Sequence, residues 1–222
     1  MSPLLVTIVC MAVSFALCGI PFGLLVARAH GVDVRKVGSG NIGMTNTLRN
    51  LGVKAGLITL IGDAGKAALA VFLSWLIFHQ SYPDQIHLFM LYGGFGAILG
   101  HNFPLPMKFK GGKGIACTVG LIAAFAWWEL PISMGLFFLA LALTKYVSLG
   151  SILIVTSFFV QTLIFALTIH PFGNLTTPET VELLIVAALV MVLGVVRHRE
   201  NIGRLVAGKE NKFSLHPKVE KN

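Results

Sequence analysis

The chain has 222 residues, of which 55% are hydrophobic and 12% are charged, and its mean hydropathy is +0.82. A soluble domain carries about 25% charged residues, so most of this chain cannot face water. The formal net charge of +8 is compatible with nucleic-acid binding, but that usually requires a basic soluble face. We therefore expect an all-α integral membrane protein without a nucleic-acid partner.

Seven apolar segments follow one another along the chain, and we expect residues 1–222 to form one polytopic membrane domain. The segments are residues 4–27, 55–78, 87–100, 115–128, 130–144, 152–169 and 181–196. No basic residue precedes the first segment, so we expect a retained helix rather than a cleaved signal peptide. The third, fourth and fifth segments have about 14 residues, fewer than the roughly 20 that cross a bilayer upright.

Lys and Arg occur in every second connection between these segments. The connections after the first, third and fifth segments and the C-terminal end are basic, whereas the others contain no Lys or Arg. The positive-inside rule then predicts an external N-terminus and a cytoplasmic C-terminus, including a polar cytoplasmic tail at residues 209–222. Seven transmembrane helices satisfy this pattern. Five helices also satisfy it if residues 115–128 and 130–144 form a re-entrant hairpin.

The first basic connection contains a loop rich in glycine, hydroxyl and amide groups. It reads GSGNIGMTN over residues 38–46, and Arg49 follows. Such a sequence can turn backbone N–H groups inward to bind an anion, although a flexible linker is the alternative. The loop matches the GxGxxG spacing of dinucleotide-binding proteins, but that motif requires a preceding strand, and apolar helices flank this loop.

The second basic connection reads GHNFPLPMKFKGGKG over residues 100–114. Its prolines and glycines exclude a continuous helix. Three lysines lie just before the next apolar segment, whose N-terminus adds a partial positive charge. The loop lacks the glycine and the Ser or Thr that a Walker A motif requires. A lipid-headgroup patch would explain the lysines but not the glycines.

The third basic region reads RHRENIGRLVAGKE over residues 197–210. His198, Asn201 and Arg204 share one face if the last apolar helix continues through them. By charge alone, a stop-transfer tail would explain this region. Inside the second apolar segment, Asp63 and Lys66 lie three residues apart, and we expect them to form an ion pair that reduces the cost of burying both charges.

The three loops, in this order and on one side of the membrane, resemble those of the bacterial acyl-phosphate:glycerol-3-phosphate acyltransferase family. The family motifs Gly-Ser-Gly-Asn…Thr-Asn, Gly-His…Phe-Lys-Gly-Gly-Lys-Gly and His-Arg…Asn-Ile…Arg…Gly…Glu match residues 38–46, 100–114 and 198–210. Met44 and Cys117 stand where the family commonly has alanine and threonine, and neither removes a polar group. The resemblance implies a seven-helix fold with cytoplasmic motifs in the bacterial cytoplasmic (inner) membrane.

The activity that the resemblance implies is transfer of a fatty acyl group from acyl phosphate to the 1-hydroxyl of glycerol 3-phosphate. The products are lysophosphatidic acid and phosphate, and this is the first step of phospholipid synthesis. Acyl phosphate already carries a good leaving group, so the protein needs no nucleophile of its own. It mainly has to hold two anions together and orient the hydroxyl. We expect no cofactor. The expected partners are both substrates, membrane lipids and the enzyme that supplies acyl phosphate.

Loop composition and resemblance together predict the site residues. The expected catalytic residues are Arg49, Lys113, His198 and Asn201. The expected substrate-binding residues are Ser39, Gly40, Asn41, Gly43, Thr45, Asn46, His101, Lys110, Gly111, Gly112, Gly114 and Ser148. Asp63, Lys66 and Glu210 are expected to be structural, and no metal site is expected. The general base is either His198 or the phosphate of the substrate.

Two alternatives compete with this interpretation. His79 and Asp84 match the His-x4-Asp signature of acyl-CoA-dependent glycerolipid acyltransferases, but they lie in an external turn away from the basic loops. A transporter of a phosphorylated solute would place broken helices and charges near the membrane midplane, often with inverted repeats. In this sequence the polar residues collect at one face, and no repeat is visible.

Overall fold

The computed structural model describes residues 1–213, and these residues form ten α-helices, three short 3-10 helices and no strand. The α-helices are α1 (Pro3–Leu17), α2 (Phe22–Ala29), α3 (Met44–Leu51), α4 (Val53–Phe78), α5 (Ile86–Asn102), α6 (Ile115–Phe125), α7 (Leu130–Thr144), α8 (Val147–Thr168), α9 (Thr177–Arg197) and α10 (Arg199–Val206). The 3-10 helices are Val34–Lys36, Leu105–Met107 and Trp127–Glu129. Most of the predicted polar tail, residues 214–222, lies outside the described part.

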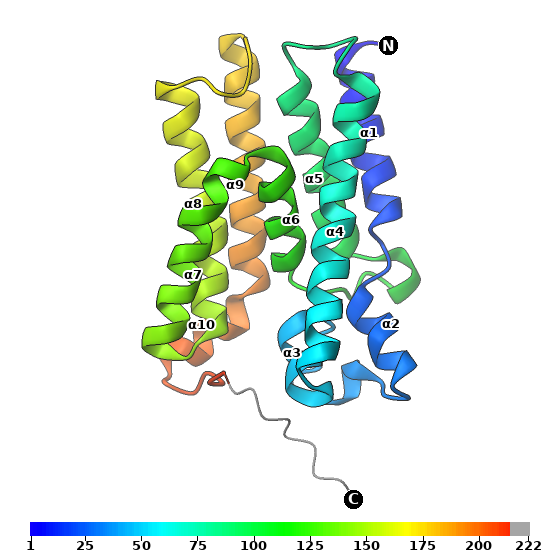
Figure 1. The fold of residues 1–222 in the computed structure, drawn as a ribbon, viewed down its shortest axis with the longest axis vertical. Coiled ribbons are helices and arrows are strands. Elements are labelled where there is room, and N and C mark those ends of the chain that lie inside the picture. Colours follow the sequence, from blue (N-terminus) through cyan, green and yellow to red (C-terminus); the bar gives the residue numbers. More distant parts are fainter. Residues whose placement is uncertain (214–222) are drawn as a thin grey trace, which may run out of the picture.

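The long helices lie side by side as one bundle (Figure 1). Five stretches are long and apolar enough to cross a membrane: Pro3–Ala29, Val53–Phe78, Trp127–Thr144, Val147–Thr168 and Thr177–Arg197. Each of the seven apolar segments predicted from the sequence is helical. The prediction of an all-α fold is therefore confirmed for residues 1–213, and five stretches have the length and composition of membrane spans.

The first apolar segment is not the single helix that its composition predicts. Helix α1 ends at Leu17, and α2 begins only at Phe22. Pro21 lies between them, and a proline lacks the N–H that would continue the helical bonding and clashes with the preceding turn. The Ile20 carbonyl accepts a hydrogen bond from Lys66 at 2.9 Å. The Phe22 N–H donates to Asp63 at 3.1 Å, so side chains of α4 satisfy the polar groups at this break.

Helices α6 and α7 form a short hairpin. Helix α6 has 11 residues, which gives a length of about 16 Å, roughly half of a hydrocarbon core. In Figure 1 the turn between α6 and α7 does not reach the level of the α8–α9 connection. Glu129 in this turn is fully buried, and its carboxyl oxygens accept hydrogen bonds from Thr162 at 3.1 and 3.2 Å. These contacts offset part of the cost of placing a carboxyl group among apolar helices.

Helices α1 and α5 pack with their backbones in close contact. A Cβ added at Gly96 would lie 2.5 Å from the carbonyl oxygen of Met11, and one added at Gly100 would lie 2.2 Å from that of Phe15. Glycines four residues apart are the usual way in which membrane helices approach closely. The position of α5, which begins the second basic loop, therefore depends on these two glycines.

We predict that Gly96→Ala destabilises the bundle by about 1–3 kcal/mol, because the new methyl group must push α1 and α5 apart. Thermal unfolding in detergent measures the effect. The matched control is Gly135→Ala in α7, where nothing lies within 4 Å of the added Cβ. We expect that variant to be neutral or stabilised by about 0.5–1 kcal/mol, because alanine is the better helix former. Equal unfolding midpoints for the two variants would contradict the close contact.

Candidate active site

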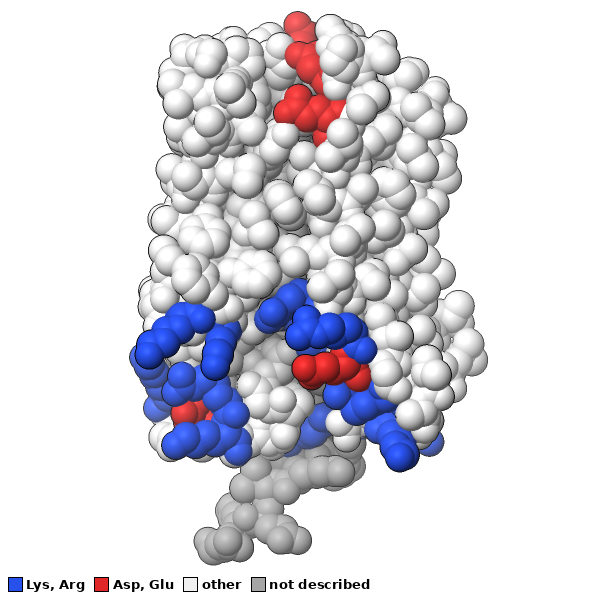
Figure 2. All heavy atoms as spheres, turned by 180° about the vertical axis from the view of Figure 1, so that it is seen from behind, with Lys and Arg blue, Asp and Glu red and all other residues white. Residues whose placement is uncertain are grey.

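On the face shown in Figure 2, lysine and arginine side chains gather at one end of the molecule, with a few acidic residues among them, whereas the charged residues visible at the opposite end are acidic. The connections before α3 and α6 and the end of α9 all lie at the basic end (Figure 1). A cavity of about 160 Å³ lies elsewhere, and Gln85, Glu179 and Glu182 are among its lining residues. Two carboxylates disfavour a phosphate ligand, so the basic end is the candidate site for anionic substrates.

The first loop is shaped by the side chain of Asn46, which is only 2% exposed. Its Oδ1 accepts the N–H of Ser39 at 3.0 Å. Its Nδ2 donates to the carbonyls of Val34 and Val37 at 3.2 and 3.1 Å. The amide of this expected binding residue is thus engaged within the loop and holds the chain in a tight curve before α3.

The remaining polar groups of the first loop differ in how they are used. Asn41 caps the turn by accepting the N–H of Gly43 at 2.9 Å. Ser39 is exposed, and Thr45 and Arg49 are half-buried. The N–H groups of Met44 and Thr45, at the start of α3, have no backbone acceptor among residues 1–213. Unpaired N–H groups at a helix start attract anions.

The second loop folds back on the end of α5. The N–H of Gly112 donates to the carbonyl of His101, and that of Gly111 donates to the carbonyl of Asn102, both at 3.1 Å. A Cβ added at Gly112 would lie 2.1 Å from Nε2 of His101, so the imidazole packs directly on the glycine backbone. Gly114 has a φ of 81°, a conformation that glycine adopts without strain, and it leads into α6.

Helix α6 therefore begins at the basic end with its first N–H groups unpaired. Among the described residues, the N–H groups of Ile115, Ala116 and Cys117 have no backbone acceptor. Ser148 lies in the first turn of α8, and its buried hydroxyl has no hydrogen-bond partner within residues 1–213. Two further helix starts thus direct donors toward this end of the bundle.

The third region clamps the second loop. Arg197 donates to the carbonyl of Gly111 at 3.0 Å and to that of Gly112 at 2.6 and 3.1 Å. Its guanidinium also lies 5.4 Å from the centre of the Phe103 ring. Arg197 is thus a site residue that the sequence analysis did not single out. A basic residue at a membrane boundary is already explained by topology, so the sequence contained no signal for these bonds.

The last apolar helix does not continue through the third region, so the condition under which His198, Asn201 and Arg204 would share one helix face is not met. Helix α9 ends at Arg197, and α10 starts at Arg199. Asn201 and Arg204 lie on α10 and both bond Glu210, at 2.9 and 2.8 Å. Asn201 also accepts a hydrogen bond from Nζ of Lys113. Glu210 therefore ties α10 together, and Asn201 connects it to the second loop.

Two titratable groups of the site are shielded from water: Lys113 is half-buried and His198 is buried. Burial lowers the pKa of Lys113 to about 8, and the nearby Arg204 lowers it further. Burial also lowers the pKa of His198 to about 4, so this imidazole is neutral at pH 7. Nδ1 of His198 lies 2.8 Å from the carbonyl of Gly194. That bond requires the proton on Nδ1 and leaves Nε2 with the lone pair.

The first and second loops also touch each other. Met107 of the second loop packs against a small apolar cluster made by Ala27, Val34 and Ile42 around the first loop. Together with the bonds of Arg197 and Lys113, this contact brings all three predicted motifs into one assembly. Lys110 is exposed and has no side-chain bond to another described residue. Asn102 is fully buried, and neither polar atom of its side chain has a partner in the described part of the chain.

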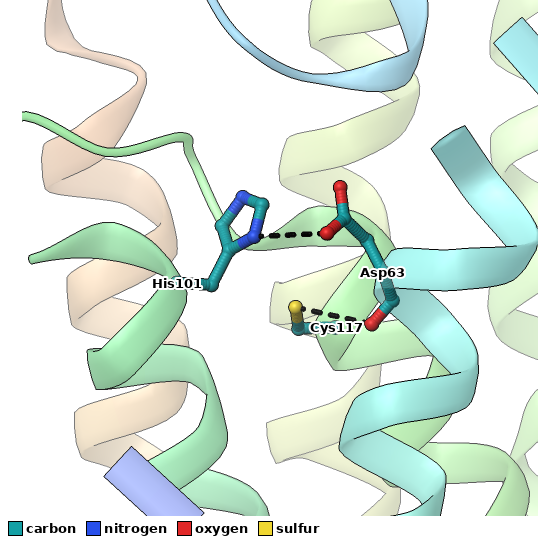
Figure 3. Close-up of side chains that lie close together, drawn as sticks. All are labelled: Asp63, His101 and Cys117. Atoms are coloured by element: carbon teal, nitrogen blue, oxygen red, sulfur yellow. Dashed lines mark hydrogen bonds and ion pairs between the residues drawn. The ribbon is translucent and has the colours of Figure 1, made fainter. Parts of the chain in front are cut away.

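A buried polar cluster lies between α4 and α5, next to these loops (Figure 3). Nζ of Lys66 lies 2.8 Å from Oδ1 of Asp63, so the predicted ion pair forms. Nδ1 of His101 lies 3.3 Å from the same oxygen and 3.1 Å from Nζ of Lys66. Asp63, His101 and Cys117 are spaced closely enough to suggest metal ligands. However, the ammonium of Lys66 already contacts the oxygen and the nitrogen that a metal ion would need, so the donor set fits an ion pair.

The fold is a bundle of apolar helices with the length and composition of membrane spans, and its basic loops lie together at one end. The family model described as glycerol-3-phosphate acyltransferase matches residues 8–208. The chain belongs to the glycerol-3-phosphate acyltransferase family.

Individual relatives agree with this assignment. A glycerol-3-phosphate acyltransferase of Trichlorobacter lovleyi is 37% identical over 91% of this chain and 95% of its own length. One of Bacillus subtilis is 38% identical over 90% of this chain and 93% of its own length. The crystal structure of PlsY, an integral membrane glycerol 3-phosphate acyltransferase, in its glycerol 3-phosphate form superposes with a TM-score of 0.79 at 30% identity, covering 94% of this chain and 96% of that one. Its lysophosphatidic acid form has a TM-score of 0.76. These matches give no support to the transporter hypothesis.

We predict that Arg197→Gln speeds amide hydrogen exchange of Gly111 and Gly112 by about tenfold or more, because the loop loses the charged donors on both carbonyls. Exchange measured by mass spectrometry on peptides covering residues 103–114 reports this change. Arg199→Gln is the control, because Arg199 is exposed and makes no side-chain bond to the second loop. Equal exchange in both variants would contradict the clamp.

Proposed function

We propose that this chain transfers a fatty acyl group from acyl phosphate to the 1-hydroxyl of glycerol 3-phosphate and releases lysophosphatidic acid and phosphate. Support comes from the family assignment and from the PlsY forms named for glycerol 3-phosphate and for lysophosphatidic acid. The carrying observation is the assembly of three loops, several helix N-termini and the cations of Lys113 and Arg204 at one end of an apolar bundle. Such an end accepts two phosphate groups while an acyl chain lies against lipid.

In this proposal the second and third loops hold the phosphate of glycerol 3-phosphate. Lys113 is the central cation, and Asn201 orients its ammonium. Gly114 and the first N–H groups of α6 donate to the phosphate oxygens, and the hydroxyl of Ser148 faces the same end from α8. Arg49 contributes a second cation from α3. At Gly111 and Gly112 the loop backbone lies so close to His101 that neither position has room for a side chain.

The first loop holds the other phosphate through Ser39, Gly40 and the N–H groups of Met44 and Thr45. Asn46 shapes this loop, because its own amide is used by Ser39, Val34 and Val37. Asn41 and Gly43 form the turn that starts α3. This division gives each substrate its own helix N-terminus. The phosphates can then lie close to each other without mutual repulsion dominating.

The chemical step is an attack by the glycerol hydroxyl oxygen on the acyl carbonyl carbon. The tetrahedral intermediate collapses when the bond between that carbon and the phosphate oxygen breaks, and phosphate leaves with the bonding electrons. The hydroxyl proton passes to the phosphate of glycerol 3-phosphate, whose second pKa is about 6. His198 is the weaker base, because burial lowers its pKa to about 4. We assign His198 to hydrogen bonding with substrate through Nε2.

The membrane orientation follows from the charge distribution. We propose that the basic end faces the cytoplasm of a bacterium, with the N-terminus outside the cytoplasmic (inner) membrane. The hairpin of α6 and α7 enters from the cytoplasmic side and returns to it, as the loops at both of its ends require. Residues 1–222 then act as one domain with a cytoplasmic tail from residue 209. Acyl phosphate reaches the site from the enzyme that makes it.

Donor choice tests the proposed reaction. Purified protein in detergent is given labelled glycerol 3-phosphate with acyl phosphate, acyl-CoA or acyl carrier protein as donor. We expect lysophosphatidic acid from acyl phosphate alone, because its phosphate both anchors the donor and leaves readily. Product from acyl-CoA alone would reject the donor assignment. Absence of product from every donor, with folded protein, would reject acyl transfer, and uptake into proteoliposomes would then test transport.

The ammonium of Lys113 gives the reaction a distinct pH dependence. Its pKa of about 8 means that the charge is lost as pH rises through that value, so we expect the KM for glycerol 3-phosphate to increase between about pH 7 and 9.5. Lys113→Arg keeps its charge over this range and should flatten the profile. Lys113→Ala should raise KM by about tenfold or more at every pH. Normal glycerol 3-phosphate kinetics in Lys113→Ala would reject the assignment, and exposed Lys36→Ala is the control.

A further inference from the structure

Asp63, Lys66 and His101 form a cluster that contacts both the helix break before α2 and the second loop. Asp63 is 1% exposed and His101 is 3% exposed, so no soluble ligand reaches them in this conformation. Figure 3 shows His101 directed toward Asp63 across the space between α5 and α4. Burying charged side chains among apolar helices costs free energy, and such residues are usually functional. The bonds of these side chains lead to two different loops.

One set of bonds leads to the first loop. Lys66 donates to the Ile20 carbonyl at 2.9 Å, and Asp63 accepts the Phe22 N–H at 3.1 Å. These two bonds fix the point where α2 leaves the break. Helix α2 in turn supports the first loop, because a Cβ added at Gly23 would lie 1.9 Å from the carbonyl oxygen of Ile42. The start of α2 therefore determines where the first loop lies.

The other set leads to the second loop. Nδ1 of His101 contacts both Lys66 and Asp63. On its opposite side, the imidazole packs against Gly112, where an added Cβ would lie 2.1 Å from Nε2. The ring is therefore a spacer of fixed length between the ion pair and the second loop. The backbone carbonyl of His101 also accepts a hydrogen bond from the Gly112 N–H at 3.1 Å.

We propose that Asp63, Lys66 and His101 are positioning residues that set the spacing between the first and second loops. This inference rests on the proposed function and assigns His101 to positioning rather than to substrate contact. Acyl transfer requires the hydroxyl and the carbonyl carbon to meet within about 3–3.5 Å. Each loop binds its own phosphate, so a change of spacing leaves both binding steps intact and slows the transfer step.

Steady-state kinetics separate this role from a purely structural one. We expect Asp63→Asn and His101→Asn to lower kcat by about tenfold or more, with KM for both substrates changed by less than about threefold. Asp63→Asn removes the charge that fixes the break, whereas His101→Asn removes the spacer and leaves the ion pair. If Asp63→Asn does not fold, His101→Asn carries the test. A selective rise in one KM, or an unchanged kcat, would overturn the proposal.

A second buried carboxyl provides the matched control. Glu129 is fully buried like Asp63, but it lies in the turn between α6 and α7, away from the loops. We expect Glu129→Gln to change the unfolding temperature without lowering kcat per folded molecule. If Glu129→Gln lowers kcat as much as Asp63→Asn does at the same unfolding temperature, a general loss of packing would explain both decreases.

Loop spacing can be measured without the reaction. Lys36 and Lys108 are exposed, and the native cysteines are all buried, so spin labels at Lys36→Cys and Lys108→Cys report the distance between the two loop regions. We expect a narrow distance distribution that broadens or shifts in Asp63→Asn and His101→Asn. An unchanged distribution would overturn the proposal. A protein that fails to transfer acyl groups would reject the proposed function, and the distances would still decide whether the cluster sets the spacing.

Discussion

An ion pair between Asp63 and Lys66 stands at the centre of this structure. Burying two charges among apolar helices is unfavourable unless each is paired and also hydrogen-bonded. Here the surrounding groups meet that requirement, since the break between α1 and α2 offers an N–H and a carbonyl and α5 offers an imidazole. The same contacts that make the pair tolerable therefore determine where α2 begins and where the second loop turns. The pair therefore connects the start of α2 and the second loop at the basic end.

The positions of the two loops relative to this pair depend on close contacts of glycine backbone. Gly23 against Ile42 and Gly112 against His101 are approaches that any Cβ would block. Loops held in this way present N–H groups instead of side chains, and several helix starts lie beside them. A site made of amides and a few cations suits a reaction in which both reactants are anionic and one is already activated. It also explains why the motifs are rich in glycine and contain no nucleophile with its base.

The sequence predicts the helices and the basic end well, because hydrophobic length and the alternation of charged connections are signals that few other structures produce. Its failures are local. The break at Pro21 is hidden because apolar residues continue on both sides of it. Composition also does not show that the amide of Asn46 forms hydrogen bonds inside the loop. The bonds of Arg197 are invisible because topology alone explains an arginine there. The helix break depends on one proline within an apolar segment, whereas the bonds of Arg197 join residues far apart in the chain.

The short helix α6 has a consequence for how the protein is made. Eleven residues are too few to be retained across a bilayer, so α6 enters the membrane as a pair with α7. The turn between them carries Glu129, whose hydrogen-bonding partner is Thr162 of α8. That residue is synthesised later. The carboxyl group of Glu129 therefore gains these hydrogen bonds only after α8 has been synthesised and has packed beside the hairpin.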